Sequence, residues 1–176
     1  YNEKNWRILP RQAVHDSSSV TYPVFTAIAA PEVQNKLNGD FAIIAGPYLQ
    51  NLATGGCELD YTLTFVSEKF ISMVFFGVLD EGEKEIFAKI PLNIDVQTGA
   101  QLALGDVLNL RDADLLPVLR LLTKKDMVDF SKGIPESWYY NGTNFVFCQR
   151  SETGEWLEAT VAASDLKKFL LKPELF

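Results

Sequence analysis

The sequence predicts an α+β fold in which an antiparallel β-meander and hairpins pack with two or three helices. Three patterns indicate this class. Residues 58–66 alternate apolar and polar side chains, as in a half-buried strand. Apolar residues recur every three or four positions from Val33 to Tyr48, which places them on one face of a helix. The pair Asn141-Gly142 separates aromatic and β-branched runs, a pattern typical of a two-residue hairpin.

The first half of the chain is expected to hold five strands, at residues 7–15, 20–28, 58–66, 70–79 and 85–95. The last three follow one another through short turns and therefore predict a three-stranded antiparallel meander. Residues 70–79 are apolar on both faces, so this strand should lie in the middle of a sheet or under a helix. Pro91 has no backbone donor and is expected at a sheet edge or a bulge.

A helix is expected to begin at Pro31, where the missing N–H of proline is no loss. It should bend or stop near Gly46-Pro47, because proline removes a helical hydrogen bond. Its inward face would consist of apolar residues: Val33, Leu37, Phe41, Ile44 and Tyr48.

A second helix should start at Asp112 or Asp114, either of which can cap it, and end near Lys124-Lys125. Its inward residues would be leucines: Leu115, Leu116, Leu119 and Leu122. The hairpin around Asn141-Gly142 follows, and the polar loop 149–155 then leads into a strand at 156–161. Ser164 should cap a short last helix that Pro173 ends, with Leu166, Phe169 and Leu170 facing inward.

The chain is expected to form one domain over residues 1–176, with halves at about 1–88 and 89–176. A chain of 176 residues can bury roughly 70% of its unfolded surface, and no linker-like stretch interrupts it. With 16 basic and 23 acidic side chains the net charge is −7, which argues against a nucleic-acid partner. No run of 18 apolar residues is present, so a membrane would be reached only through an anchor outside this chain.

Chemistry-bearing motifs are scarce. His15 is the one histidine, and neither Cys-x-x-Cys nor His-x-x-x-His spacing occurs, so we expect no metal, no cofactor and no catalytic residue. Cys57 and Cys148 would form either one disulfide or two buried thiols; a bridge over about 90 residues would stabilise by roughly 4–5 kcal/mol. The acids at Glu58 and Asp60, and those in the turn at 80–83, fit a solvated surface.

Binding residues are expected around the last hairpins. Trp138, Tyr139 and Tyr140 are consecutive, so at least one ring must leave the core face of its strand. The polar loop 149–155 lies between two well-marked strands, where binding residues are often found. The candidate ligand-binding residues are therefore Arg150, Glu155, Trp156, Tyr139 and Tyr140.

The order of several segments resembles a bacterial extracytoplasmic domain of unknown function. That domain occurs at the C-terminus of the lysozyme-sensing anti-sigma factor RsiV and at the N-terminus of the peptidoglycan deacetylase PdaC. The resemblance covers about residues 10–172. It rests on Tyr22-Pro23-Val24, Pro31 to Asn38, Leu59 to Phe65, Ile71 to Phe75, Asn93 to Gly99, the hairpin from Tyr139 to Phe147, and Asp165-Leu166.

The resemblance implies an extracytoplasmic domain, secreted or attached to a membrane anchor, that binds or senses a protein or a peptidoglycan-type ligand. Residues 148–156 lack the tyrosine- and proline-rich stretch that relatives often carry there, so lysozyme binding does not carry over with the resemblance. The alternative is an enzyme that acts on cell-wall glycan through a carboxylate pair. A third hypothesis is a structural spacer without a ligand.

Overall fold

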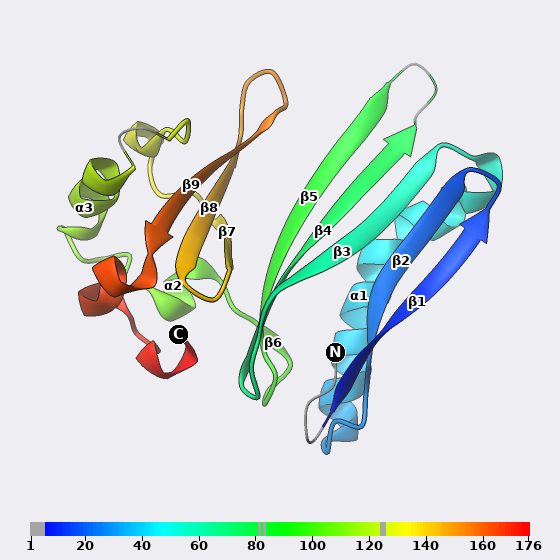
Figure 1. The fold of residues 1–176 in the computed structure, drawn as a ribbon, viewed down its shortest axis with the longest axis horizontal. Helices are drawn as coiled ribbons and strands as arrows, with labels where there is room; N and C mark the ends of the chain where they lie inside the picture. Colours follow the sequence, from blue (N-terminus) through cyan, green and yellow to red (C-terminus); the bar gives the residue numbers. More distant parts are fainter. Residues whose placement is uncertain (1–5, 81, 83, 124–125) are drawn as a thin grey trace. The chain divides into compact units, whose positions relative to one another are not determined.

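The computed structural model describes residues 6–80, 82, 84–123 and 126–176, and these residues form nine strands in two β-sheets (Figure 1). The first sheet has the order β1-β2-β3-β4-β5-β6 and the second has the order β7-β8-β9. The α+β class is confirmed. Strand bounds in the first sheet are β1 Arg7–His15, β2 Ser18–Thr26, β3 Cys57–Val66, β4 Phe70–Asp80, β5 Glu85–Asp95 and β6 Ala100–Gln101; in the second they are β7 Ser137–Tyr140, β8 Asn144–Arg150 and β9 Trp156–Ala162.

The chain divides into two compact units that interleave in sequence. Unit 1 contains residues 1–62, 74–90 and 96–99, and unit 2 contains residues 63–73, 91–95 and 100–176. Three crossings between the units therefore fall inside β3, β4 and β5. The sequence predicted a single division near residue 88, whereas the structure divides each of these long strands between the units.

One strand pair of the first sheet is parallel. β1 and β2 form an antiparallel hairpin, as the patterns predict, and the turn between them holds Asp16 at a φ of 50°. β2 and β3 then pair in parallel, with Ser19 opposite Glu58 and Val20 opposite Leu59. A parallel pair needs a crossover connection, which helix α1 (Pro31–Asn51) supplies. The sequence predicts an antiparallel meander and hairpins but assigns no pairing between these two strands, because side-chain alternation marks a strand without naming its partner.

The strands β3 to β5 follow the predicted order. In β3, Leu59 is buried while Glu58 and Asp60 are exposed, which confirms the alternation. β4 lies in the middle of the first sheet, between β3 and β5, which is one of the two positions predicted from its apolar faces. Pro91 lies on β5 before the only two positions, Ile94 and Asp95, at which β6 pairs, so it occupies the open edge of that strand.

Helix α1 lies along the first three strands of the sheet (Figure 1). Four residues of its predicted stripe are buried, and Ala45 completes the inward face in place of Ile44, which is half-buried: the buried residues are Val33, Leu37, Phe41, Ala45 and Tyr48. Of the predicted bend or stop near Gly46-Pro47, the stop is wrong, because the helix continues to Asn51. Pro47 lies on the exposed face, where water can satisfy the carbonyl group that proline leaves without a helical partner.

A chain of aromatic contacts fills the core of unit 1. Neighbouring ring centroids lie between 5.5 and 6.1 Å apart along the series Trp6, Phe25, Phe41, Phe75 and Tyr61. These spacings suit tilted and offset ring pairs, which stabilise beyond the area that they bury.

Gly77 leaves room in β4 for the buried side chain of Tyr48. A Cβ atom built on Gly77 would overlap the ring and hydroxyl of Tyr48. We expect Gly77→Ala to lower the free energy of unfolding by about 1–3 kcal/mol, the usual cost of overpacking. Urea unfolding measures it. In the control, Gly39→Ala, the new methyl group meets nothing within 4 Å on helix α1, so it should stabilise by about 0.5–1 kcal/mol. An unchanged midpoint for Gly77→Ala would contradict the packing.

The helices of unit 2 are short. Helix α3 (Leu115–Leu122) begins after Asp114, within the predicted range, and buries Leu115 and Leu119. Leu116 is half-buried and Leu122 is 43% exposed, so the predicted inward position of Leu122 is wrong. Leu122 lies on the same face of the helix as Leu115 and Leu119, but it is the last residue of this two-turn helix and is not covered there. Lys124 and Lys125 lie outside the described residues, as do Glu81 and Glu83.

Short helical turns replace or add to the predicted elements. The sequence missed α2 (Leu104–Val107), and the last predicted helix is a 3₁₀ helix, η3 (Ala163–Phe169), preceded by Ala162 and not capped by Ser164. η3 buries Leu166 and Phe169 as predicted. The other 3₁₀ turns are η1 Leu52–Thr54 in unit 1 and η2 Phe130–Lys132 and η4 Pro173–Leu175 in unit 2.

The β7–β8 hairpin forms where predicted, but its central residues are shifted by one. The amide of Asn141 donates to the carbonyl of Asn144 (3.1 Å), which leaves Gly142 and Thr143 at the tip. The side-chain oxygen Oδ1 of Asn141 accepts from the amides of Thr143 (3.2 Å) and Asn144 (2.8 Å). Only Gly142 has a positive φ, of 92°. Asn141 therefore acts through its side chain and not through a left-handed backbone.

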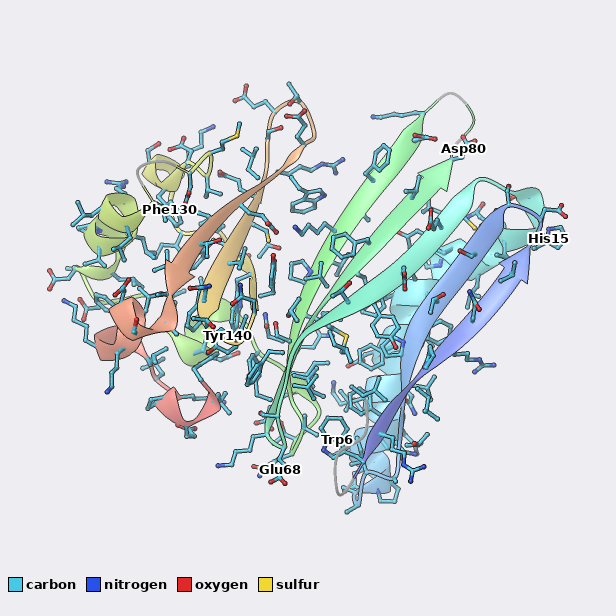
Figure 2. All side chains as sticks on the ribbon, viewed as in Figure 1. Trp6, His15, Glu68, Asp80, Phe130 and Tyr140 are labelled. Atoms are coloured by element: carbon cyan, nitrogen blue, oxygen red, sulfur yellow. The ribbon has the colours of Figure 1, made fainter. Side chains whose placement is uncertain are left out.

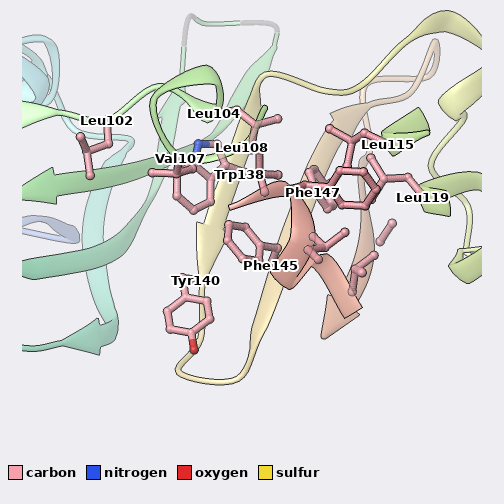
Figure 3. Packing of buried hydrophobic residues seen from close by; sticks show 14 of the residues in the cluster. Leu102, Leu104, Val107, Leu108, Leu115, Leu119, Trp138, Tyr140, Phe145 and Phe147 are labelled. Carbon is pink, nitrogen blue, oxygen red and sulfur yellow. The ribbon is translucent and has the colours of Figure 1, made fainter. Parts of the chain in front are cut away.

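Aromatic and leucine side chains form the core of unit 2 (Figure 3). Trp138, Tyr140, Phe145 and Phe147 come from one face of the β7–β8 hairpin, and Leu104, Val107, Leu115 and Leu119 come from the helices. Trp138 and Phe145 stack at 5.3 Å, and Phe130 meets Phe147 edge-on at 5.6 Å.

Two buried polar side chains join β4, β5 and β7 within this unit. Ser72 Oγ donates to Asn93 Oδ1 (2.7 Å), and Asn93 Nδ2 donates to the carbonyl of Trp138 (2.7 Å). The amide of Tyr140 donates back to Ser72 Oγ (2.8 Å). We call these three bonds the Ser72–Asn93 network. It gives the edge strand β7 hydrogen-bond partners on its side away from β8.

Removing either side chain should leave buried polar groups without partners. We expect Ser72→Ala and Asn93→Ala each to cost about 2–3 kcal/mol, and the double variant to cost less than the sum because both act on one network. Guanidinium unfolding of the single and double variants measures this. Ser17→Ala, at an exposed turn hydroxyl, should stay within about 0.5 kcal/mol of the parent. Additive losses in the double variant would show that the bonds act independently.

Candidate functional site

The second sheet separates the predicted binding residues between its two faces. Figure 2 labels one of them, Tyr140, on this sheet. Trp138 and Tyr140 point into the core, with 2% and 4% of their surface exposed, and Tyr139 lies on the opposite face. Residues that pair across antiparallel strands share a face, so Arg150 and Trp156, which pair with each other, lie on the same face as Tyr139. The structure thus groups three of the five candidates and places the ring of Tyr140 in the core.

The predicted polar loop is shorter in the structure. β8 runs to Arg150 and β9 starts at Trp156, so only residues 151–155 form the turn. Arg150 and Glu155 are exposed, as a binding role requires, whereas Trp156 is half-buried. The Trp156 indole Nε1 is buried and has no hydrogen-bond partner in the structure.

This turn is held by several hydrogen bonds. The amide of Ser151 donates to the carbonyl of Glu155 (2.8 Å), and the amide of Glu155 donates to Ser151 Oγ (3.0 Å). Arg150 Nε donates to the carbonyl of Gly154 (3.2 Å). Gly154 has a φ of 89°, which glycine adopts without strain. The end of the β8–β9 hairpin is therefore a preformed turn that carries charges of both signs.

Sequence reasoning missed Glu158 as a neighbour of Tyr139. Glu158 Oε1 accepts from the hydroxyl of Tyr139 at 3.0 Å and lies 3.8 Å from Cys148 Sγ. Burial raises the pKa of Tyr139 well above its usual range, and the adjacent carboxylate of Glu158 raises it further. The register that places Cys148 opposite Glu158 creates this group, and no local sequence pattern reports it.

The two cysteines are separate buried thiols in the structure. Cys57 Sγ donates to the carbonyl of Tyr48 at 3.3 Å in unit 1. Cys148 lies on β8 of unit 2, beside Glu158.

A cavity of about 340 Å³ opens beside the tip of the β7–β8 hairpin, entirely within unit 2. We call it the hydroxyl pocket, because three of its lining side chains carry hydroxyl groups. Its lining residues are Tyr140, Gly142, Thr143, Ala163, Ser164, Lys167, Leu170, Pro173 and Phe176. Its volume lies within the range of about 300–1,000 Å³ that is common for small-molecule sites.

Three elements position the polar groups of the hydroxyl pocket. Thr143 lies at the hairpin tip, and its carbonyl accepts from the amide of Ala163 at 2.9 Å, which joins the tip to the start of η3. Ser164 and Lys167 follow on η3. Tyr140 also lines the pocket, and Figure 3 shows its phenol oxygen pointing away from Trp138 and Phe145.

The sequence could not predict this convergence. The sequence predicts Thr143 at the start of the strand after the Asn141-Gly142 turn and Ser164 as a helix cap. The two residues meet only because β8 and β9 pair with Asn144 opposite Ala162. Tyr140 was the one member of the pocket among the candidates.

The two neighbouring lysines of η3 differ in their surroundings. Lys168 Nζ lies 3.3 Å from the Asp114 carboxylate and 4.5 Å from the centre of the Phe169 ring. Lys167 lines the hydroxyl pocket, and within the described part of the chain it forms no ion pair. Lys167 therefore brings an uncompensated positive charge to the pocket.

Acidic side chains gather at no described cavity. Glu58 and Asp60 are exposed on β3, and Asp60 accepts from the amide of Tyr61. His15 lies 3.5 Å from Asp16 at an exposed hairpin end. Within the described residues, no group of His, Cys, Asp and Glu side chains could hold a metal ion. In that same part of the chain, no helix combines the length and the apolar character needed to cross a membrane.

Comparison with known proteins gives a fold match. No protein-family model matches the chain, and no curated protein matches it in sequence. Among solved structures, a DUF3298 family member from Bacteroides fragilis NCTC 9343 superposes with a TM-score of 0.66 at 12% identity, over 94% of this chain and 92% of that one. The chain has the fold of a DUF3298 protein. A second DUF3298 protein, from Pseudomonas aeruginosa PAO1, gives a TM-score of 0.59 at 12% identity over 97% and 95% of the two chains.

The DUF3298 structures match nearly the whole length of this chain, so both of its units belong to the shared fold. At 12% identity the match concerns the fold alone, and it carries no residue of the candidate site from one protein to another.

The Tyr139–Glu158 pair gives a spectroscopic prediction. Glu158→Gln removes the carboxylate charge but not the burial, so the phenol pKa should fall while it stays above its usual value of about 10. Ultraviolet phenolate absorbance against pH follows the shift, with Tyr139→Phe to assign the signal. Because the unfolded phenol ionises near pH 10, this group makes unfolding easier as the pH rises above that value. Identical titrations for Glu158→Gln and the parent would exclude the interaction.

Proposed function

We propose that this chain is an extracytoplasmic domain that binds or senses a cell-envelope ligand and performs no chemistry of its own. The resemblance to the RsiV and PdaC domains supports the compartment, and the DUF3298 fold match is compatible with it. The ligand classes are a cell-wall glycan and a protein. The observation that carries the proposal is the convergence of three hydroxyl-bearing residues and one lysine on the lining of the hydroxyl pocket.

The pocket favours a glycan fragment over a protein. Its partly apolar lining includes Leu170, Pro173 and Phe176, which can contact the carbon faces of a sugar ring. Thr143 and Ser164 are exposed at its rim and can exchange hydrogen bonds with sugar hydroxyl and acetamido groups. A small number of placed polar groups over an apolar base is the usual form of a small-molecule site.

A protein ligand would use the other candidate region, the end of the β8–β9 hairpin. Arg150 is exposed at the end of β8, and Glu155 is exposed in the turn that follows, which hydrogen bonds hold together. A preformed turn loses little conformational entropy on binding. The two candidate regions share no residue, so their variants serve as controls for each other.

Calorimetric titration with soluble peptidoglycan fragments tests the proposal. We expect binding by the parent, and an affinity lower by about tenfold or more in the double variant Thr143→Val, Ser164→Ala, since each lost hydrogen bond is worth about 0.5–1.5 kcal/mol. Arg150→Ala with Trp156→Ala should leave this affinity unchanged.

The opposite pattern would identify a different ligand class. If the parent binds lysozyme and only the double variant Arg150→Ala, Trp156→Ala loses this binding, the ligand is a protein and its site is the end of the β8–β9 hairpin. If neither peptidoglycan fragments nor lysozyme binds, the binding proposal is wrong and the structural spacer is the remaining hypothesis. Turnover of the glycan fragments would support the enzyme hypothesis.

Fractionation of cells that produce the full-length protein tests the compartment. Recovery of the protein in the cytoplasm would overturn the proposed extracytoplasmic location.

A further inference from the structure

The lining of the hydroxyl pocket is electrostatically one-sided. Among the described residues that line it, Lys167 has the only charged side chain, and none is Asp or Glu. This contrasts with the composition of the chain, which has 23 acidic against 16 basic residues. Because the other lysine of this turn, Lys168, is paired with Asp114, the positive charge at the pocket comes from Lys167.

The hydroxyl groups add hydrogen-bond donors to this charge. Burial raises the pKa of Tyr140, so its phenol stays protonated near neutral pH and can donate. Thr143 and Ser164 each offer one further O–H donor. Three hydroxyl donors beside an ammonium group, without a carboxylate acceptor, complement a ligand that is rich in acceptor oxygens and negatively charged.

We infer that Lys167 makes the hydroxyl pocket selective for ligands that carry a carboxylate. This inference rests on the proposed function, because it specifies which cell-wall fragment the pocket accepts. Two parts of a bacterial cell-wall fragment supply that group. One is an acidic amino sugar with a lactyl carboxylate, and the other is the terminal carboxylate of a stem peptide. The pocket volume of about 340 Å³ accommodates one such unit and not a long glycan strand.

Matched probes separate the charge from the rest of the ligand. The sugar pair consists of N-acetylmuramic acid and its methyl ester, which lacks the charge. The peptide pair consists of D-alanyl-D-alanine and its C-terminal amide, which lacks the terminal carboxylate. Affinities come from nuclear magnetic resonance titrations. We expect the parent to bind one of the two acids with an affinity about fivefold higher than that of its neutral counterpart. This ratio corresponds to the free energy of an exposed ion pair. At about 1 M salt, where the screening length is about 3 Å, the preference should shrink.

Lys167→Gln should abolish the preference and leave the affinity for the neutral probe unchanged. Lys168→Gln removes the same charge one residue away, from a side chain paired with Asp114, and should retain the preference. Thermal unfolding of both variants checks that the fold is intact. Selectivity for the sugar acid or for the peptide acid identifies the source of the carboxylate.

The outcomes separate this inference from the proposed function. If the parent binds acid and neutral probes equally, the carboxylate selectivity is wrong while glycan binding stands. If Lys167→Gln keeps the preference, another group supplies it and the role of Lys167 is overturned. If none of these probes and no peptidoglycan fragment binds, the proposed function and the inference fail together.

Discussion

The position of β7 depends on the Ser72–Asn93 network. An edge strand leaves a row of backbone groups without partners, and in a buried setting each such group costs stability. Here Ser72 accepts the amide of Tyr140 and Asn93 donates to the carbonyl of Trp138, so both backbone groups are satisfied without a further strand. These bonds fix which residues of β7 face the core. That choice directs Tyr140 into the aromatic cluster and Tyr139 to the other face.

The hydroxyl pocket follows from the same arrangement. Once β7 is fixed, the hairpin tip brings Thr143 to one side of the pocket, and the register of β8 with β9 brings Ala163 and Ser164 to the other. The bond between the amide of Ala163 and the carbonyl of Thr143 holds the two sides together. Strand register, more than any single side chain, determines which polar groups meet there.

Local patterns predicted the elements well because each depends on neighbours within a few residues. The alternation around Leu59 and the helix start at Pro31 are of this kind. The parallel pairing of β2 with β3, and the hydrogen bond that joins Ser72 to Tyr140 across 68 positions, depend on distant segments and left no local signal. Arg150 and Glu155 are exposed at the end of β8 and in the turn after it, which agrees with the local polarity of this segment, whereas Lys167 offered no pattern to recognise.

Tyr140 belongs to two environments at once, since its ring packs against Phe65, Phe70 and Phe145 while its hydroxyl end lines the pocket. A substitution of Tyr140 therefore changes the packing of the core as well as the lining of the pocket. The residues Thr143, Ser164 and Lys167 are exposed, so substitutions there leave the packing of the core unchanged. Under the proposed function, the ligand preference of this chain can therefore change through Thr143, Ser164 and Lys167 while Tyr140 and the core stay constant.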